Sequence, residues 1–125
     1  MDDRKRVLIV DDDSRSRRIF EINLTSMGYE VVMANNGEEA VEILAGDPYF
    51  DLVITDVAMP YLTGFELSKK LKEYTETKDI PIIATSAFHD WHKAIEEHEL
   101  IVDGFIPKPI ERDTLLRELK KVGLI

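Results

Sequence analysis

The sequence lacks cysteine and glycine-rich loops, and these absences exclude several kinds of metal, catalytic and nucleotide-binding site. The 125 residues contain no cysteine, so the chain can form no disulfide framework, no thiolate metal site and no cysteine nucleophile. None of the six glycines falls in the glycine-rich phosphate loops that mark nucleotide-binding folds. The chemistry of this chain therefore has to rest on other side chains.

Long apolar runs and an excess of positive charge are also lacking. The opening MDDRKRVLIVDDD has a single apolar run, far too short for a signal peptide or a spanning helix. The 25 acids outnumber the 16 bases and give a formal charge of −9, which argues against direct binding of nucleic acid or of an anionic membrane. We expect a soluble, cytoplasmic protein with no membrane insertion, whose acidity suits a cation ligand or simply favours solubility.

What is present fits one compact domain. With 44% hydrophobic residues, the chain can build one core and is too short for two, so residues 1–125 are treated as a single domain. Five strand-sized apolar runs are continuous rather than alternating, as in strands of a parallel sheet that are covered on both faces. The runs span residues 7–10, 31–33, 52–54, 80–84 and 105–106.

Segments with helical spacing separate these runs. The first begins after Ser14 and stops at Gly28, and the second opens at Asn35 or Asn36 and ends at Gly46. The first helix is expected to bury Ile19, Phe20, Leu24 and Met27, and three further helices are expected around residues 65–71, 94–95 and 115–122. Strand then helix, five times, predicts an α/β fold: a (βα)5 doubly wound, parallel, five-stranded sheet. Such chains commonly have the strand order 2-1-3-4-5, with the ligand site beyond the carboxyl ends of strands 1 and 3.

Acidic residues follow these two strands. Asp11, Asp12 and Asp13 come directly after the first strand, and Asp56 follows the third. If the strands are neighbours, carboxylates converge within a few ångströms and repel one another, so a positive charge must lie among them. Ligands that are all oxygen atoms favour Mg²⁺. Alone, three successive aspartates are more typical of a solvated turn and helix cap, and we expect Asp13 to have that capping role.

Two polar side chains follow later strands. Ser86 ends the fourth apolar run, and Lys108 follows the fifth. A lysine ammonium at this edge of the sheet could hold an anion that is already bound to the metal. Each residue alone has an ordinary alternative, as a turn serine or a surface lysine, but their joint arrival at one edge favours a shared site.

Four motifs at four strand ends carry a resemblance to a known family. VLIVDDD, DLVITDVAMP, IIATSA and FIPKPI stand in the order and spacing of the receiver domain of bacterial two-component response regulators, of the chemotaxis-regulator type. The chain resembles this domain over essentially its whole length. The resemblance implies the flavodoxin-like receiver fold and a role in phosphorelay signal transduction, as a phosphoacceptor that assists its own phosphorylation and dephosphorylation rather than as an enzyme.

The resemblance also implies roles for individual residues. The aspartate at the position of Asp56 accepts a phosphoryl group from a histidine kinase or a histidine phosphotransfer protein. Asp11, Asp12, Asp56 and the backbone carbonyl of Ala58 would hold Mg²⁺.

The same resemblance implies a conformational switch. Ser86 would hydrogen-bond the phosphoryl oxygens and Lys108 would pair with them. Ser86 would then move toward the phosphoryl group, and the aromatic Phe105 would turn inward behind it. The face built from the fourth helix, fifth strand and fifth helix would change, and would bind a downstream protein or a second copy of the chain. An ordinary core position is the alternative role for Phe105.

Two other functions are weighed against this one. A haloacid-dehalogenase-type enzyme also carries Asp-x-Asp after its first strand, as Asp11 and Asp13 do, but Arg15 stands where Thr or Val is expected. A degenerate receiver would serve only as a protein-binding module, and the complete set of site residues argues against it. Phosphorylation chemistry distinguishes the two receiver hypotheses.

Two remaining features concern the second half of the chain. His89 and His92 share a helix face, and with His98 they raise the possibility of a transition-metal site, but ordinary solvent-facing histidines explain them. The chain ends at Ile125, where the fifth helix is expected to finish, so no output domain is expected within it. It is either a protein that works alone or part of a longer one.

Overall fold

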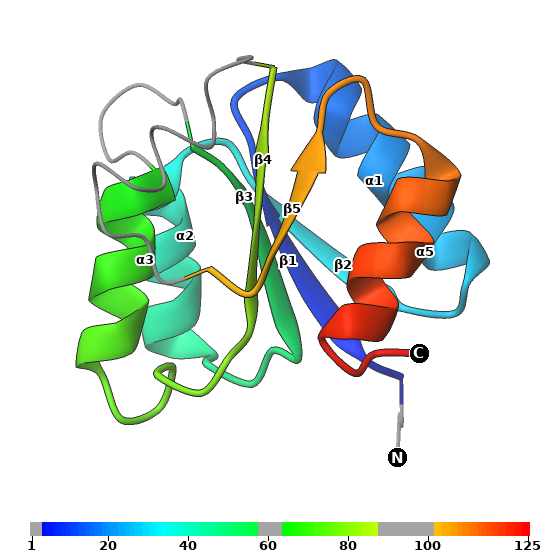
Figure 1. The fold of residues 1–125 in the computed structure, drawn as a ribbon. Helices are drawn as coiled ribbons and strands as arrows, with labels where there is room; N and C mark the ends of the chain where they lie inside the picture. The colour runs from blue at the N-terminus through cyan, green and yellow to red at the C-terminus, as the bar shows by residue number, and fades with distance from the viewer. Residues whose placement is uncertain (1–3, 58–63, 88–101) are drawn as a thin grey trace.

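Helices cover both faces of one parallel sheet (Figure 1). The computed structural model describes residues 4–57, 64–87 and 102–125. In chain order the described elements are β1 (Arg6–Val10), α1 (Ser14–Ser26), β2 (Glu30–Ala34), α2 (Gly37–Gly46), β3 (Leu52–Asp56), α3 (Gly64–Glu73), β4 (Ile82–Ser86), β5 (Gly104–Pro107) and α5 (Arg112–Lys121).

The sheet has the predicted order β2-β1-β3-β4-β5, and all its pairs are parallel. β1 lies between β2 and β3, so residues 7–10 pair with 31–34 on one side and with 52–55 on the other. Every residue of β3 and β4 is buried, which accounts for their continuous apolar sequence. The predicted fold class is confirmed.

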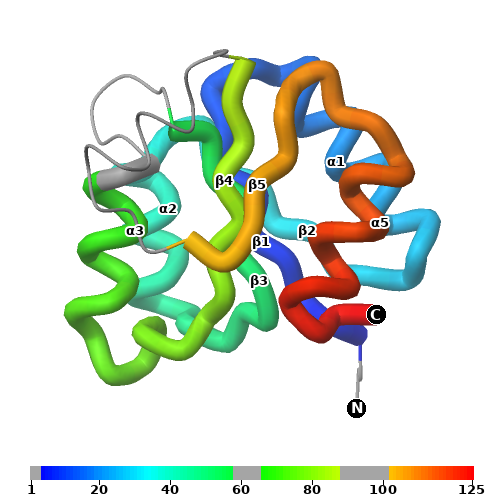
Figure 2. The backbone as a smooth tube through the Cα atoms, in the orientation of Figure 1, coloured from blue at the N-terminus to red at the C-terminus, as the bar shows by residue number. Residues whose placement is uncertain are grey.

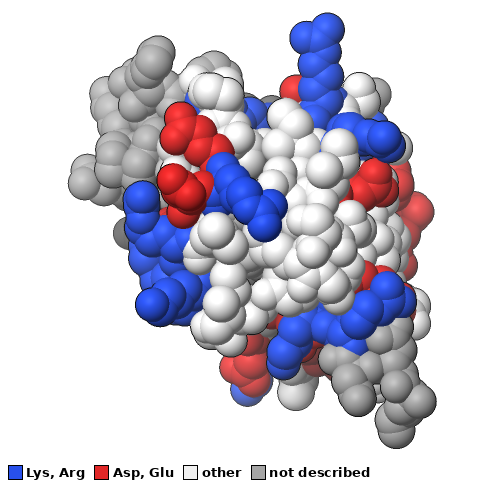
Figure 3. Space-filling view, turned by 90° about the vertical axis from the view of Figure 1, so that its right-hand side faces the viewer, with Lys and Arg blue, Asp and Glu red and all other residues white. Residues whose placement is uncertain are grey.

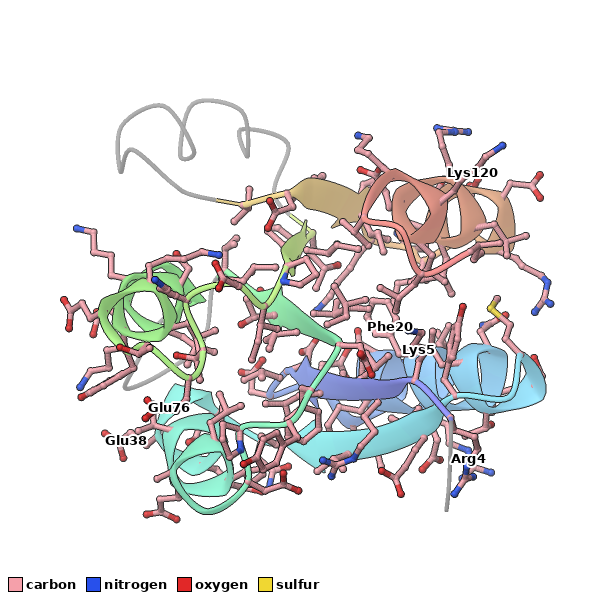
Figure 4. The ribbon with its side chains drawn as sticks, turned by 90° about the horizontal axis from the view of Figure 1, so that it is seen from below. Arg4, Lys5, Phe20, Glu38, Glu76 and Lys120 are labelled. Atoms are coloured by element: carbon pink, nitrogen blue, oxygen red, sulfur yellow. The ribbon has the colours of Figure 1, made fainter. Side chains whose placement is uncertain are left out.

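Two hydrophobic clusters lie on opposite faces of the sheet. Helices α2 and α3 contribute Ala40, Leu44, Leu67 and Leu71 to one cluster. Helices α1 and α5 contribute Phe20, Leu24, Leu115 and Leu119 to the other. Figure 4 shows Phe20 pointing from α1 into the interior of the molecule. Because adjacent strand residues face opposite sides, one sheet supports both clusters.

Side chains and backbone conformation determine where the helices begin and end. Asn36 caps α2, since its Oδ1 accepts a hydrogen bond from the Glu39 N–H at 2.8 Å. Gly28 follows α1 with a φ of 91°, a conformation that glycine adopts without strain. The predicted helix around residues 94–95 lies outside the described residues.

Two expectations differ from the structure. Ile19 was expected to face the core, but it is 38% exposed, because the inward side of α1 is defined by Ser16, Phe20 and Leu24. The fourth strand begins at Ile82, whereas Ile80 lies in the preceding turn, where its N–H bonds to the carbonyl of Thr77. Ile80 is nevertheless buried, so its apolar character reports burial rather than strand conformation.

The face that carries α1 and α5 has a broad uncharged area with both basic and acidic side chains around it (Figure 3). Ile19 and Ile22 are the exposed isoleucines of α1. Among the described helices, none is long and apolar enough to span a membrane. The carboxyl ends of the parallel strands lie at one end of the molecule (Figure 2).

Candidate phosphoryl-acceptor site

The acidic run after β1 divides into two roles. Asp13 caps α1, because its Oδ1 accepts the Arg15 N–H at 3.1 Å and its Oδ2 accepts the Ser16 hydroxyl at 3.0 Å. Asp11 is fully buried, and its Oδ1 accepts the Asp13 N–H at 2.9 Å. The guanidinium of Arg17 donates to the Asp11 carbonyl at 2.7 Å. The loop is therefore held from both sides, and the expected capping role of Asp13 is confirmed.

Asp56 ends β3 directly beside this loop. It is 5% exposed, and β3 neighbours β1 as the predicted order requires. Asp11, Asp12 and Asp56 each offer a carboxylate oxygen, and these oxygens all lie within 4.8 Å of one another. The tertiary structure thus gathers three acids from two strand ends into one pocket.

Lys108 lies against the same acids. Its Nζ is 2.6 Å from Asp56 Oδ2 and 2.9 Å from Asp11 Oδ2, and its side chain is only 14% exposed. The Lys108 N–H also donates to the Ser86 carbonyl at 2.9 Å, which ties the segment after β5 to the end of β4. Neighbouring strands therefore bring this lysine to acids that are 52 residues or more away in the sequence.

Burial and charge shift the pKa values in this pocket. Burial has the largest effect on Asp11 and raises its pKa, and the charge of Asp56 adds to the increase. The hydrogen bond from Lys108 lowers the pKa but does not outweigh burial, so the pKa of Asp11 stays raised. Burial alone would lower the pKa of Lys108, but the hydrogen bonds and charges of Asp56 and Asp11 outweigh it and raise that pKa. The lysine is accordingly held as an ammonium ion that neutralises part of the acidic charge.

The acids of this pocket fit a hard divalent cation. Asp11 Oδ2 is buried, and the Lys108 ammonium, 2.9 Å away, is its partner in the described part of the chain. An acidic oxygen in that position, with two further carboxylates close by, is the donor set that Mg²⁺ prefers. The backbone carbonyl of Ala58, expected as a further ligand, lies outside the described residues.

The two expected switch residues lie next to this pocket. Ser86 ends β4 and is 1% exposed. Phe105 is 8% exposed and belongs to a small buried cluster with Ala84, its neighbour on β4, and Val57, the residue that follows Asp56. Both lie at the strand positions that the sequence predicted, an inward aromatic at position 105 also fits the ordinary core role, and the switch itself stays a prediction.

Sequence patterns missed two supporting residues. Arg17 holds the Asp11 carbonyl, and the buried Thr85 hydroxyl donates to the Ile106 carbonyl at 2.7 Å, joining β4 to β5. The only signal for Arg17 is its place one helical turn beyond the acids. Thr85 is simply a small polar residue inside an otherwise apolar strand.

Comparison with known proteins agrees with this geometry. The family model for the response regulator receiver domain matches residues 7–120. The chain belongs to the response regulator receiver domain family. It is thus the receiver domain of a two-component response regulator, and the haloacid-dehalogenase alternative loses its support. Receiver domains of this family are signalling phosphoacceptors, they typically use Mg²⁺, and they interact with a histidine kinase or phosphotransfer protein.

The relatives differ in how much of their own length this chain covers. The ycf27 protein of Porphyra purpurea is 36% identical over 119 residues, which cover 95% of this chain and 47% of that protein. The two-component response regulator ORR5 of Oryza sativa subsp. japonica is 33% identical over 116 residues, covering 93% of this chain and 87% of ORR5. The receiver domain therefore spans about half the length of the ycf27 relatives and most of the length of ORR5.

Solved structures share the fold over almost the whole chain. The chemotaxis response regulator CheY4 of Vibrio cholerae has a TM-score of 0.85 and 34% identity, with 95% of this chain and 98% of CheY4 covered. A response regulator receiver protein from Pseudomonas putida has a TM-score of 0.82 and 30% identity, with 94% and 97% covered. The similarity thus extends to receivers solved as separate chains.

Proposed function

We propose that this receiver domain accepts a phosphoryl group on Asp56 in a Mg²⁺-dependent reaction. One observation carries the proposal: the Asp56 carboxylate, 5% exposed, lies 2.6 Å from the Lys108 ammonium and within 4.8 Å of ligand oxygens from Asp11 and Asp12. A carboxylate nucleophile needs positioning and neutralisation of charge more than it needs a base.

The transfer itself requires no proton removal from the acceptor. An Asp56 carboxylate oxygen attacks the phosphorus atom of a phosphohistidine, the new P–O bond forms, and the P–N bond of the donor breaks. The electron pair of that bond stays on the imidazole nitrogen, and the ring leaves as neutral imidazole because its other nitrogen carries a proton in the phosphohistidine. The donor is a histidine kinase or a histidine phosphotransfer protein, and the product is an acyl phosphate on Asp56.

The described residues supply most of what this reaction needs. Lys108 offers a positive charge to the phosphoryl oxygens, and Ser86 offers a hydroxyl from the end of the adjacent strand. Asp11 and Asp12 together with Asp56 would hold Mg²⁺, which would neutralise phosphoryl charge when bound.

Signalling would follow from a change around Ser86 and Phe105. Phe105 shares a buried cluster with Ala84 and with Val57 beside Asp56, so a shift of Ser86 toward the phosphoryl group would alter the packing of β5. Output would occur at the face of β5, α5 and the helix expected near residues 94–95, through a downstream protein or a second copy. A cytoplasmic location remains a prediction.

The test is intact mass after incubation with acetyl phosphate, with and without Mg²⁺. We expect the chain to gain the mass of one phosphoryl group, in an adduct that is stable to acid and labile to base, only when Mg²⁺ is present. Asp56→Asn deletes the nucleophile and relieves carboxylate crowding, so it should fold and stay unlabelled.

Each alternative outcome has a definite reading. A labelled Asp56→Asn variant would remove Asp56 from its assigned role. If the wild-type chain neither gains mass nor binds beryllofluoride, a stable mimic of the phosphoryl group, the degenerate binding module becomes the better description.

A further inference from the structure

Glu118 is a buried acid that the site described above does not use. It belongs to α5, where its neighbours Arg117 and Lys120 are exposed, yet it is only 6% exposed itself. Figure 4 shows the contrasting position of Lys120, which points away from the molecule. Burying a carboxylate costs free energy unless it is hydrogen-bonded and paired with a positive charge, so the partners of Glu118 indicate its structural role.

Both carboxylate oxygens of Glu118 have partners. Oε1 accepts the backbone N–H of Phe105 at 2.8 Å, and Oε2 lies 2.8 Å from Lys121 Nζ. Burial would raise the pKa of Glu118, but the hydrogen bonds and charge of Lys121 and the Phe105 N–H outweigh it and lower that pKa. The carboxylate is therefore ionised while it holds the Phe105 N–H.

The hydrogen bond lies on the free side of an edge strand. β5 ends the described sheet and pairs with β4 alone, so a backbone N–H on its other side has no strand to bond with. Glu118 fills that position from α5. A Cβ on Gly104 would lie 3.3 Å from Glu118 Oε1, so the glycine leaves room for the carboxylate to approach the strand.

The same short strand leads into the acidic pocket. Phe105 shares a small buried cluster with Ala84 of β4 and Val57, the residue after Asp56. Three residues beyond Phe105, the Lys108 backbone bonds to Ser86 and its ammonium bonds to Asp56. β5 is thus held at one end by the pocket and at the other by an acid of α5.

We propose that Glu118 is a positioning residue that couples α5 to the phosphorylation site, by holding β5 at the Phe105 N–H so that Lys108 stays in place for the phosphoryl group. The inference rests on the proposed function of Asp56. Because coupling between two sites is reciprocal, a partner that displaces α5 would also change the affinity of the pocket for a phosphoryl group.

The test compares Glu118→Met with Glu118→Gln. Methionine has similar length and no strong acceptor, whereas glutamine keeps an oxygen for the Phe105 N–H. The readouts are the Kd for beryllofluoride in saturating Mg²⁺ and the amide proton shift of Phe105 by NMR. Losing one buried hydrogen bond that the bound state needs should weaken beryllofluoride binding about fivefold in Glu118→Met, with Glu118→Gln within about twofold of wild type.

Two further variants separate coupling from stability. Lys121→Met removes the ion pair but keeps the acceptor, so we expect a Kd within about twofold of wild type. Gly104→Ala pushes on Glu118 from the side of β5 and should weaken binding in the same direction as Glu118→Met, which provides the test if Glu118→Met does not fold.

The outcomes are distinct. A purely structural Glu118 would lower the thermal midpoint of the variants and leave the Kd of the folded protein within about twofold of wild type, and that result would overturn the coupling. If wild type itself neither binds beryllofluoride nor labels at Asp56, the proposed function fails and the coupling falls with it.

Discussion

Lys108 is the residue on which the charge balance of the pocket depends. Its ammonium lies within 2.9 Å of two buried acids, Asp11 and Asp56, which would otherwise repel one another. In an environment of reduced dielectric, such repulsion is substantial, and the lysine relieves it. In the proposed transfer reaction, the same side chain would also serve the phosphoryl group.

Lys108→Ala should separate these two contributions. We expect the variant to fold and to retain Mg²⁺ binding, since the three carboxylates remain and a competing cation is gone. Phosphorylation by acetyl phosphate should slow about a hundredfold, because a preorganised charge at the phosphoryl oxygens is lost. Labelling rates from intact mass and Mg²⁺ titration measure the two effects.

Lys120→Ala is the matched control for that experiment. Lys120 is an exposed lysine of α5, so its removal should leave both measurements unchanged. A Lys108→Ala variant that labels at the wild-type rate would exclude Lys108 from the reaction.

At the scale of single elements, α2 illustrates how local sequence positions a helix. Asn36 accepts the Glu39 N–H, and Glu38 and Glu39 place negative charge in the first turn, where the helix dipole favours it. Its apolar side packs Ala40 and Leu44 into the core. Local capping and burial thus agree, as expected for a helix whose start was predicted to within one residue.

Asn36→Ala should destabilise the domain by about 1 kcal/mol, because the Glu39 N–H loses its capping acceptor. Asn36→Asp keeps a side-chain oxygen at the same position and should remain close to wild type. Urea denaturation followed by circular dichroism measures both. Equal free energies of unfolding for Asn36→Ala and wild type would show that the capping bond contributes nothing.

At the scale of the whole molecule, one sheet joins two cores. Val53 and Ile54 are neighbours in β3, yet they belong to clusters on opposite faces. Since the same strands support both clusters, loss of packing on one face would weaken the sheet against which the other face packs. The domain should therefore unfold as a single cooperative unit.

Two large-to-small substitutions test this cooperativity. Phe20→Ala in one cluster and Leu71→Ala in the other should each lower the free energy of unfolding by about 2–5 kcal/mol. Both should shift one transition that circular dichroism and NMR report together. Ile22→Ala is the surface control, since Ile22 is 54% exposed, and it should change stability by less than about 0.5 kcal/mol.

Separate transitions for the two faces would contradict a single cooperative unit. That outcome would mean that helices α2 and α3 can detach while α1 and α5 remain packed.

Much of this protein could be read from its sequence. Continuous apolar runs predicted five buried parallel strands, and glycine and asparagine signals marked the ends of α1 and α2. Acids directly after two strands predicted that carboxylates converge at one edge of the sheet, because parallel strands end on one side of it. These features depend on residue patterns within single strands and helices and on the order of those elements along the chain, and both can be read from a sequence.

Other features were decided only by the tertiary structure. Ile19 and Phe20 are adjacent and both apolar, and only the rotation of α1 against the sheet exposes one and buries the other. Glu118 looks like a solvated acid in a charged helix, yet it reaches the edge of β5 and holds the Phe105 N–H. Such roles come from contacts between elements that pack against each other in the folded chain. The order of polar and apolar residues along one helix or strand does not show which element packs against it.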